Sequence, residues 1–280
     1  MKKHWSTIVL VLIFLFGISL LLYPTVSNYW NSFHMSRVIE DYEKALDNLD
    51  SETYRKILNS AKEYNDLLAK TQSQITLPDN KLEEYNNQLS VAGSTIMGYI
   101  EIPEINVDLP IYHGTSDSAL RYGTGHLNGT SLPIGGESSH CVICGHRGLA
   151  SARLFTDLDR LTIGDEFTLY ILDDTYTYEV CDIYIVEPND VSKLLIEDGE
   201  DYCTLYTCTP YGINTQRLLI RGRNISSYAS HIRVSSEAYK IDSYIAAPIF
   251  AIPLLFILLI WLIISTGKNK KGGDDTFNDE

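Results

Sequence analysis

The sequence predicts a mainly β domain folded as a closed or nearly closed barrel, with a helical segment before it and a transmembrane helix at each end. Three observations predict this arrangement. Short strand-like stretches separated by turn residues run from Met97 to Arg223. Apolar residues recur at three- and four-residue steps ahead of them. An apolar run close to the length of a bilayer-spanning helix lies near each end of the chain.

The two apolar runs extend from Ser6 to Tyr23 and from Ile245 to Ile264, with lysines on the outer side of each. A helix needs about 20 apolar residues to cross a bilayer, and both runs are near that length. Positive charge favours the cytoplasmic side of a membrane, so we expect both termini in the cytoplasm and the region between the runs outside it. The lysines are Lys2, Lys3, Lys268, Lys270 and Lys271.

Each apolar run has an alternative interpretation. The first could be a cleaved signal peptide, but it is longer than a usual signal-peptide core and no Ala-x-Ala site follows it. The second could be a buried core helix, but it carries no charge and a lysine cluster follows it. Pro248 and Pro253 would kink that helix without preventing a span. We therefore expect two anchors.

The region before the strands is predicted to be helical. Apolar residues from Val38 to Leu49 fall on one helical face, and those from Tyr54 to Leu68 repeat the pattern. Asp50 or Ser51, in the break between the two helices, can cap the second one. A polar loop and a short helical piece complete this segment, which we expect to pack on the β domain.

Turn residues divide the β domain into seven expected strands. Gly164-Asp165 and Asp173-Asp174 are turn signals between neighbouring strands. The strands are expected over residues 97–102, 107–113, 140–146, 165–172, 176–187, 203–209 and 216–223.

The chain thus divides into six regions. They are an N-terminal membrane anchor over 1–30, a helical pre-barrel segment over 31–95, a barrel over 96–226, a linker over 227–244, a C-terminal transmembrane helix over 245–265 and a polar cytoplasmic tail over 266–280.

Charge and cysteine content restrict the function. The formal net charge is −14 and no basic stripe offsets it, which argues against nucleic acid as a partner. The chain has 5 cysteines, so at least one is unpaired within the chain. An exported domain can hold disulfides, and a free thiol there requires a chemical explanation.

Cys208 and Arg217 are expected to face each other across a hairpin. The first strand runs from Thr204 to Thr209, the loop covers 210–214 and the return strand covers 216–221. Cys208 closes the first strand and Arg217 opens the second, so antiparallel pairing brings them close together.

His146 is the third candidate. It stands where a strand gives way to a loop, and Cys144, two residues earlier, is expected on the same face. A strand end beside Gly145 is suited to present an imidazole to a cleft.

Together the three side chains are sufficient for acyl transfer through a thioester. A cysteine thiol with its ordinary pKa of about 8.5 is mostly protonated at pH 7. A neighbouring cation lowers that pKa, and an imidazole can accept and return the proton. An arginine beside the sulfur can also hold the oxygen of a tetrahedral intermediate.

Other interpretations of these residues exist. Taken singly, Cys208 could be a small buried hydrophobe, His146 a solvated or hydrogen-bonded structural residue and Arg217 a surface charge. A two-anchor surface scaffold or a redox sensor is a further alternative for the whole chain, but neither needs a thiol, an imidazole and a guanidinium together.

A metal site is the rival interpretation for the cysteines. Cys141-x2-Cys144 and Cys203-x4-Cys208 could supply four thiolates. Cys141 and Cys144 lie in one alternating strand and are expected to point to opposite faces, which disfavours a shared ion. Cys141 and Cys181 either pair with each other or fill the core, and the sequence does not choose between these.

Several blocks of the chain resemble the class C, pilus-assembling sortases of Gram-positive bacteria. They read MGYIEIPEINVDLPIYHG, GTGHLNGTSLPIGG, GHRG, LFTDLDRLTIGDEF and TLYTCTPYGINTQRLLIRG, in order between Met97 and Arg223. A TCTPYG segment alone is a moderate signal, whereas long blocks in register over this length are a specific one.

The resemblance implies an eight-stranded sortase barrel with Cys208 as the nucleophile, His146 as the catalytic histidine and Arg217 as the catalytic arginine. Sortases cut a Leu-Pro-x-Thr-Gly-like sorting signal between Thr and Gly, through a thioester on the cysteine. In the pilus class a pilin lysine resolves the thioester, so the implied partners are pilin subunits and the membrane. The resemblance implies neither a cofactor nor a metal.

Two departures from the family pattern stand out. Many pilus-class enzymes carry a lid whose Asp-Pro-aromatic triplet plugs the active site, but the corresponding stretch here is ITLPDNKLEEY, in which Pro78 precedes Asp79. The sequence therefore does not predict a plug, and neither Asp79 nor Tyr85 is favoured as a substitute. Gln216 replaces a histidine that often precedes the arginine, and we expect it to tune activity without abolishing it.

The leading hypothesis is a pilin-polymerising transpeptidase anchored in the cell membrane, with its catalytic domain extracytoplasmic. The alternative is a cell-wall-anchoring sortase that uses a peptidoglycan-precursor amine as the acceptor. The C-terminal anchor and the helical pre-barrel segment favour the first.

Overall fold

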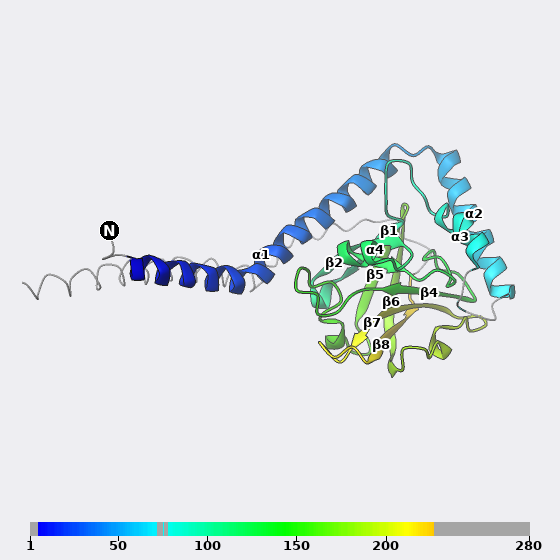
Figure 1. Ribbon diagram of the computed structural model, residues 1–280. Helices are drawn as coiled ribbons and strands as arrows, with labels where there is room; N and C mark the ends of the chain where they lie inside the picture. The colour runs from blue at the N-terminus through cyan, green and yellow to red at the C-terminus, as the bar shows by residue number, and fades with distance from the viewer. Residues whose placement is uncertain (1–4, 72–74, 76–77, 227–280) are drawn as a thin grey trace, which may run out of the picture. The chain divides into compact units, whose positions relative to one another are not determined.

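The computed structural model describes residues 5–71, 75 and 78–226, and its central feature is a closed β-barrel (Figure 1). The strands close in the order β1-β2-β3-β4-β7-β8-β6-β5. β2 pairs parallel with β3 and β4 with β7, and the other pairs are antiparallel. The strands are β1 (Gly98–Ile102), β2 (Val107–His113), β3 (Thr124–His126), β4 (Ser139–Cys144), β5 (Glu166–Ile171), β6 (Asp174–Val186), β7 (Asp201–Thr209) and β8 (Gln216–Asn224). The mainly β barrel expected from the strand pattern is confirmed, as are the eight strands that the resemblance implied.

The seven strands expected from the pattern are all present, but the pattern missed β3. This strand has only three residues, Thr124, Gly125 and His126, too few to show an alternation. It becomes a strand because β2 and β4 lie on either side of it. β4 ends at Cys144, two residues before the end expected for this strand, and His146 lies in the loop that follows, at the strand-to-loop boundary where the sequence placed it.

The helices are α1 (Trp5–Asp47), α2 (Ser51–Thr71), α3 (Leu82–Asn86) and α4 (Asp117–Tyr122), with short 3-10 turns η2 (Asp79–Lys81), η3 (Pro103–Ile105), η4 (Leu158–Arg160) and η5 (Ser192–Leu194). The break between α1 and α2 lies where the sequence predicted it. Asp50 caps α2, since its carboxylate accepts hydrogen bonds from the backbone N–H groups of Glu52 and Thr53, both at 2.9 Å. Of the two candidate caps, the structure uses Asp50 and not Ser51.

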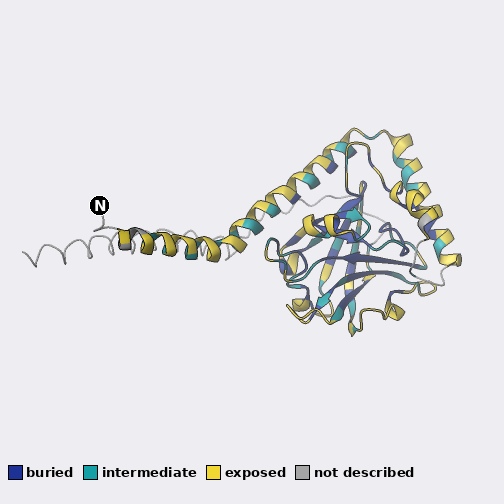
Figure 2. Cartoon of the chain, viewed as in Figure 1, coloured by how far each residue is buried: buried dark blue, intermediate teal, exposed yellow. Residues whose placement is uncertain are grey.

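Within the described residues, α1 is the one helix long and apolar enough to cross a membrane. Its N-terminal apolar side chains, among them Leu12, Phe16 and Leu21, are exposed (Figure 2). The helix could therefore serve as a membrane anchor. The second expected span, over 245–265, lies outside the described residues, as do the linker and the tail.

The compact unit that begins at Val26 contains the barrel, and the second half of α1 packs against it. Tyr42 of α1 is fully buried, and its hydroxyl donates to the carbonyl of Met97 at 3.1 Å and accepts from the N–H of Leu172 at 2.7 Å. Met97 precedes β1 and Leu172 follows β5. One phenol thus satisfies two backbone groups at the end of neighbouring strands, where no regular pairing reaches them.

We expect Tyr42→Phe to lower the free energy of unfolding by about 1–3 kcal/mol, because two buried backbone groups would lose their partner. Urea unfolding of the full chain in detergent measures this. Tyr99→Phe is the matched control, since its hydroxyl also joins the barrel to α1, through Glu43 at 2.9 Å, but at a half-buried position. Equal losses from the two variants would contradict the role given to Tyr42.

Two apolar clusters lie on opposite faces of the strands. The larger fills the barrel and includes Cys141 and Ile143 of β4. The smaller takes the alternate residues of the same strand, Val142 and Cys144, together with Leu219 of β8. This alternation is the period-2 pattern of a strand covered on both faces. The smaller cluster therefore lies outside the barrel, over β4, β7 and β8.

Candidate active site

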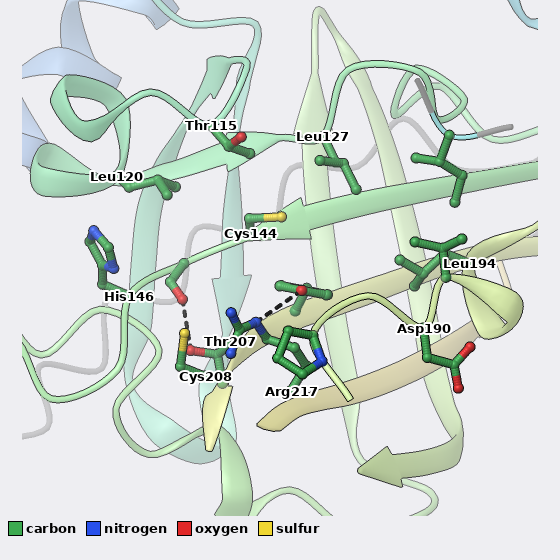
Figure 3. A pocket seen from close by; sticks show the side chains of 15 residues that line it. Thr115, Leu120, Leu127, Cys144, His146, Asp190, Leu194, Thr207, Cys208 and Arg217 are labelled. Atoms are coloured by element: carbon green, nitrogen blue, oxygen red, sulfur yellow. Dashed lines mark hydrogen bonds between the residues drawn. The ribbon is translucent and has the colours of Figure 1, made fainter. Parts of the chain in front are cut away.

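A pocket of about 370 Å³ opens beside the smaller cluster, and all three residues singled out in the sequence line it (Figure 3). His146 comes from the loop after β4, Cys208 from the end of β7 and Arg217 from the start of β8. In Figure 3 the side chains of His146 and Arg217 lie on either side of Cys208. Segments separated by about 60 residues in the sequence thus meet at one site.

Cys208 and Arg217 are direct partners in the antiparallel register of β7 and β8. The hairpin predicted from the sequence is confirmed, including this pairing. Both side chains are half-buried. The guanidinium is fixed by three hydrogen bonds: Nε donates to the Tyr206 hydroxyl at 3.0 Å, and Nη1 donates to the carbonyls of Asn214 and Gln216 at 3.1 and 3.0 Å.

His146 is placed by the parallel pairing of β4 with β7, which continues one residue beyond β4. The N–H of Gly145 donates to the carbonyl of Tyr206 at 3.0 Å, and the Thr207 hydroxyl donates to the carbonyl of Gly145 at 2.7 Å. A Cβ at Gly145 would stand 2.6 Å from the Phe155 ring, so only glycine fits there. These contacts bring the imidazole to β7, the strand that carries Cys208 next to its last residue.

A side-chain hydrogen bond also joins Arg147, which follows His146, to Thr209, which follows Cys208. Arg147 is nearly buried, and its Nη1 donates to the hydroxyl of Thr209 at 3.0 Å while Nη2 pairs with the carboxylate of Asp159. The loop carrying His146 and the strand end carrying Cys208 are therefore linked through both backbone and side chains.

The His146 ring and the Cys208 sulfur make no hydrogen bond to any residue in the described part of the chain, so both remain available to a ligand. Cys208 as a residue is half-buried, neither enclosed in the core nor fully exposed. In contrast, burial raises the pKa of the Cys144 thiol, which lines the same pocket, to about 12. Cys144 therefore stays protonated and contributes apolar surface.

The remaining cysteines belong to the structure. All five are free thiols. Cys141 lies opposite Cys203 in the register of β4 and β7, inside the barrel, and burial raises its pKa well above the ordinary value. Cys181 is half-buried on β6 and donates to the carbonyl of Arg221 at 3.4 Å. Of the two alternatives left by the sequence, Cys141 and Cys181 do not pair, and Cys141 fills the core.

Among the described residues, no group of three or more His, Cys, Asp or Glu side chains could hold a metal ion. Cys141 and Cys144 belong to different clusters on opposite faces of β4, as their spacing predicted.

The far end of the pocket is apolar and is closed by the loop between β6 and β7. Leu194 of η5, 1% exposed, packs there with Cys144, near Leu120 and Leu127. The sequence pattern gave no sign of this wall, because its residues come from irregular segments far apart in the chain.

Two buried side chains, one from β8 and one from β4, hold this loop in place by hydrogen bonds. Arg221 of β8, whose side chain is 5% exposed, donates to the carbonyl of Lys193 at 2.6 Å and to the Glu197 carboxylate at 2.8 Å. The Nδ1–H of His140 donates to the carbonyl of Leu195 at 2.8 Å. Burial lowers the pKa of His140 to about 4, so the ring is neutral at physiological pH. The residues on either side of Leu194 are thus each fixed by a hydrogen bond from a buried side chain.

Of the two residues considered as substitutes for a plug, Tyr85 does not reach the pocket. Tyr85 is fully buried away from the pocket, where its hydroxyl donates to Nδ1 of His126 at 2.8 Å. The side chain of Asp79 lies outside the described residues. Ile75 lines the pocket instead. Gln216 donates to the Glu187 carboxylate at 3.2 Å, and its carbonyl helps to hold Arg217.

Comparison with known proteins identifies the family. Residues 100–225 match the sortase domain family. Sortase C1 from Streptococcus agalactiae is 49% identical, with a TM-score of 0.66 over 68% of this chain and 99% of that chain. A sortase C from Streptococcus pneumoniae, whose structure was described as informative on pilin substrate specificity, is 43% identical, with a TM-score of 0.63 over 68% and 97%. A sortase C from Clostridium perfringens, solved with the C-terminal cell wall sorting motif, is 42% identical, with a TM-score of 0.60 over 69% and 100%.

The family match over residues 100–225 spans nearly the whole barrel and includes Cys208, His146 and Arg217, and the three solved structures are 42–49% identical to this chain. The chain belongs to the sortase family of cysteine transpeptidases and, among them, to the class C sortases.

Proposed function

We propose that this enzyme cleaves a Leu-Pro-x-Thr-Gly-like sorting signal between Thr and Gly and joins the threonine to a lysine of a pilin subunit. The observation that carries the proposal is the meeting of Cys208, His146 and Arg217 in one pocket of a sortase barrel. The sortase C of Clostridium perfringens was solved with a sorting motif, and that of Streptococcus pneumoniae was discussed in terms of pilin specificity.

In this mechanism the proton of Cys208 rests on His146, and the Cys208 thiolate attacks the threonine carbonyl carbon. Arg217, its direct partner across the hairpin, stabilises the negative charge that develops on the carbonyl oxygen. The C–N bond to glycine then breaks, and His146 gives a proton to the departing amine. The result is a thioester between threonine and Cys208.

The second half reverses the roles. The lysine amine attacks the thioester carbon and loses a proton to His146, and the C–S bond breaks to release the Cys208 thiolate. The product is an isopeptide bond, and the enzyme returns to its starting protonation. The apolar end of the pocket, formed by Leu120, Leu127 and Leu194, would receive the apolar part of the sorting signal.

The proposal includes a location at the cell membrane of a Gram-positive bacterium, with the barrel outside the cytoplasm. The apolar N-terminal half of α1 supports an anchor. Pilin precursors with sorting signals would then meet the enzyme at the outer face of the cell membrane.

The acceptor distinguishes this function from cell-wall anchoring. The test supplies the full chain in detergent with a Leu-Pro-x-Thr-Gly peptide and, in competition, a lysine-containing pilin segment and a peptidoglycan-precursor peptide. Mass spectrometry of the products should show the threonine on the lysine side chain. A product formed only with the precursor amine would overturn the pilin assignment and leave the transpeptidase assignment intact.

The same proposal makes Arg221, which holds the loop between β6 and β7 in place, a determinant of substrate binding. Arg221→Met removes the hydrogen bonds to Lys193 and Glu197, so the wall carrying Leu194 is no longer fixed. We expect KM for the sorting peptide to rise several-fold while kcat changes by less than about twofold, the pattern of a lost ground-state contact.

Steady-state kinetics on the peptide measure this effect. Arg223→Met is the matched control on the same strand, because Arg223 pairs with Glu200 at an exposed position, where ion pairs contribute little. An unchanged KM in Arg221→Met would contradict the role given to Arg221 in holding the pocket wall.

A further inference from the structure

The guanidinium of Arg217 has one nitrogen with no hydrogen-bond partner in the part of the chain that the structure describes. Nε is bound by the Tyr206 hydroxyl and Nη1 by the two carbonyls of Asn214 and Gln216. A guanidinium is planar, so fixing Nε and Nη1 fixes the plane and the direction of Nη2. Nη2 is therefore the group that Arg217 can offer to a ligand in the pocket.

Tyr206 is the side chain that controls this orientation. It lies on β7 two residues before Cys208 and hence on the same face of the strand. Its hydroxyl accepts from Arg217 Nε at 3.0 Å, the bond drawn as a dashed line beside Arg217 in Figure 3. The two carbonyls that hold Nη1 belong to the turn and to the start of β8, so Tyr206 supplies the one contact that crosses from the strand of the cysteine.

The Tyr206 ring is itself held on two sides. It is half-buried and packs on the smaller apolar cluster, next to Cys144 and Leu219. Its backbone carbonyl accepts from the N–H of Gly145, the residue before His146. The hydroxyl thus belongs to a residue that lies on the strand of Cys208 and is hydrogen-bonded to the segment that carries His146.

We propose that Tyr206 is a positioning residue that aims Nη2 of Arg217 at the carbonyl oxygen of the bound threonine. This inference rests on the role given to Arg217 in the proposed function. The tyrosine does not touch the reacting atoms; it acts by holding the arginine in the orientation needed when charge develops on the oxygen. Its loss should therefore slow the chemical steps and leave binding of the sorting signal unchanged.

The test compares Tyr206→Phe with wild type, using the full chain in detergent, a Leu-Pro-x-Thr-Gly peptide and a lysine-containing acceptor. We expect kcat to fall roughly 10- to 100-fold, the range for a lost hydrogen bond to a charged group, with KM within about twofold of wild type.

The chain offers a matched control. The hydroxyl of Tyr202, on the same strand, also accepts a hydrogen bond from an arginine of β8, Arg223, at 3.0 Å. It lies outside the pocket. Tyr202→Phe removes the same kind of hydroxyl–guanidinium bond and should leave kcat and KM at the wild-type values.

A double-mutant cycle separates positioning from a general structural effect. If Tyr206 acts through Arg217, then Tyr206→Phe should lower kcat in the wild-type background and have no further effect in Arg217→Ala. An equal loss in both backgrounds would overturn the inference, as would a wild-type kcat for Tyr206→Phe. Thermal unfolding checks that the variant is folded, and Tyr206→Met, which also lacks the hydroxyl, must give the same kcat loss if Tyr206→Phe is unstable.

Failure of the proposed function would look different. In that case Cys208→Ala would still form product, whatever Tyr206 does. An inactive Cys208→Ala, a slow Arg217→Ala and a fully active Tyr206→Phe would refute only the positioning role.

Discussion

Replacing Cys208 with alanine should abolish formation of both the thioester and the isopeptide product. No other described thiol can take its place, because the pocket's second cysteine, Cys144, has its pKa raised to about 12 by burial and remains protonated. The measurement is mass spectrometry of the enzyme after incubation with a sorting peptide, in which wild type should gain the mass of the acyl fragment and Cys208→Ala should not.

Cys181→Ala is the control for this loss. Cys181 is the other half-buried cysteine, but it lies on β6 outside the pocket. It should acylate and turn over like wild type. Covalent product from Cys208→Ala would refute the assignment of the nucleophile and the mechanism with it.

Replacing Arg217 with alanine should lower kcat/KM by roughly 100- to 1000-fold. Removing one donor from a developing oxyanion typically costs about 2.7–4 kcal/mol of transition-state stabilisation. The guanidinium is held beside Cys208 by three hydrogen bonds, so its position is set before substrate binds and little of that energy is spent on ordering it. Single-turnover acylation rates measure the effect directly.

Arg217→Lys should restore only part of this loss. An ammonium keeps the charge but lacks the planar fork that lets one side chain bind the hydroxyl, the turn carbonyls and the substrate together. Acylation of Arg217→Ala at the wild-type rate would show that the oxyanion is stabilised elsewhere.

Much of the barrel could be predicted because its strands carry local signals. β5 and β6 alternate apolar and polar residues and are joined by a turn at Leu172-Asp173, and β7 and β8 form a hairpin of definite length. The cap at Asp50 has a local signal as well. β3 has none, since its three residues gain their pairing from strands contributed by distant parts of the chain.

The candidate site divides in the same way. Cys208 and Arg217 are neighbours through one hairpin, so their spacing alone places them together. His146 joins them only because β4 and β7 pair in parallel, and a parallel pair needs a long connection that leaves no local trace. The residue pattern placed His146 at a strand end but did not show which strand lies beside it, and the resemblance to a known family implied its catalytic role.

The sequence by itself determined the barrel class, the two helices before the barrel with the break between them, and the pairing of Cys208 with Arg217, because each depends on contacts between residues close in the chain. Only the tertiary structure decided which cysteines are buried, that Ile75 and Leu194 reach the pocket, that Arg221 and His140 hold its wall, and that Tyr206 orients Arg217. These features depend on contacts between residues that are far apart in the chain and meet only when the barrel closes. The periodicity of a single strand carries no information about such contacts.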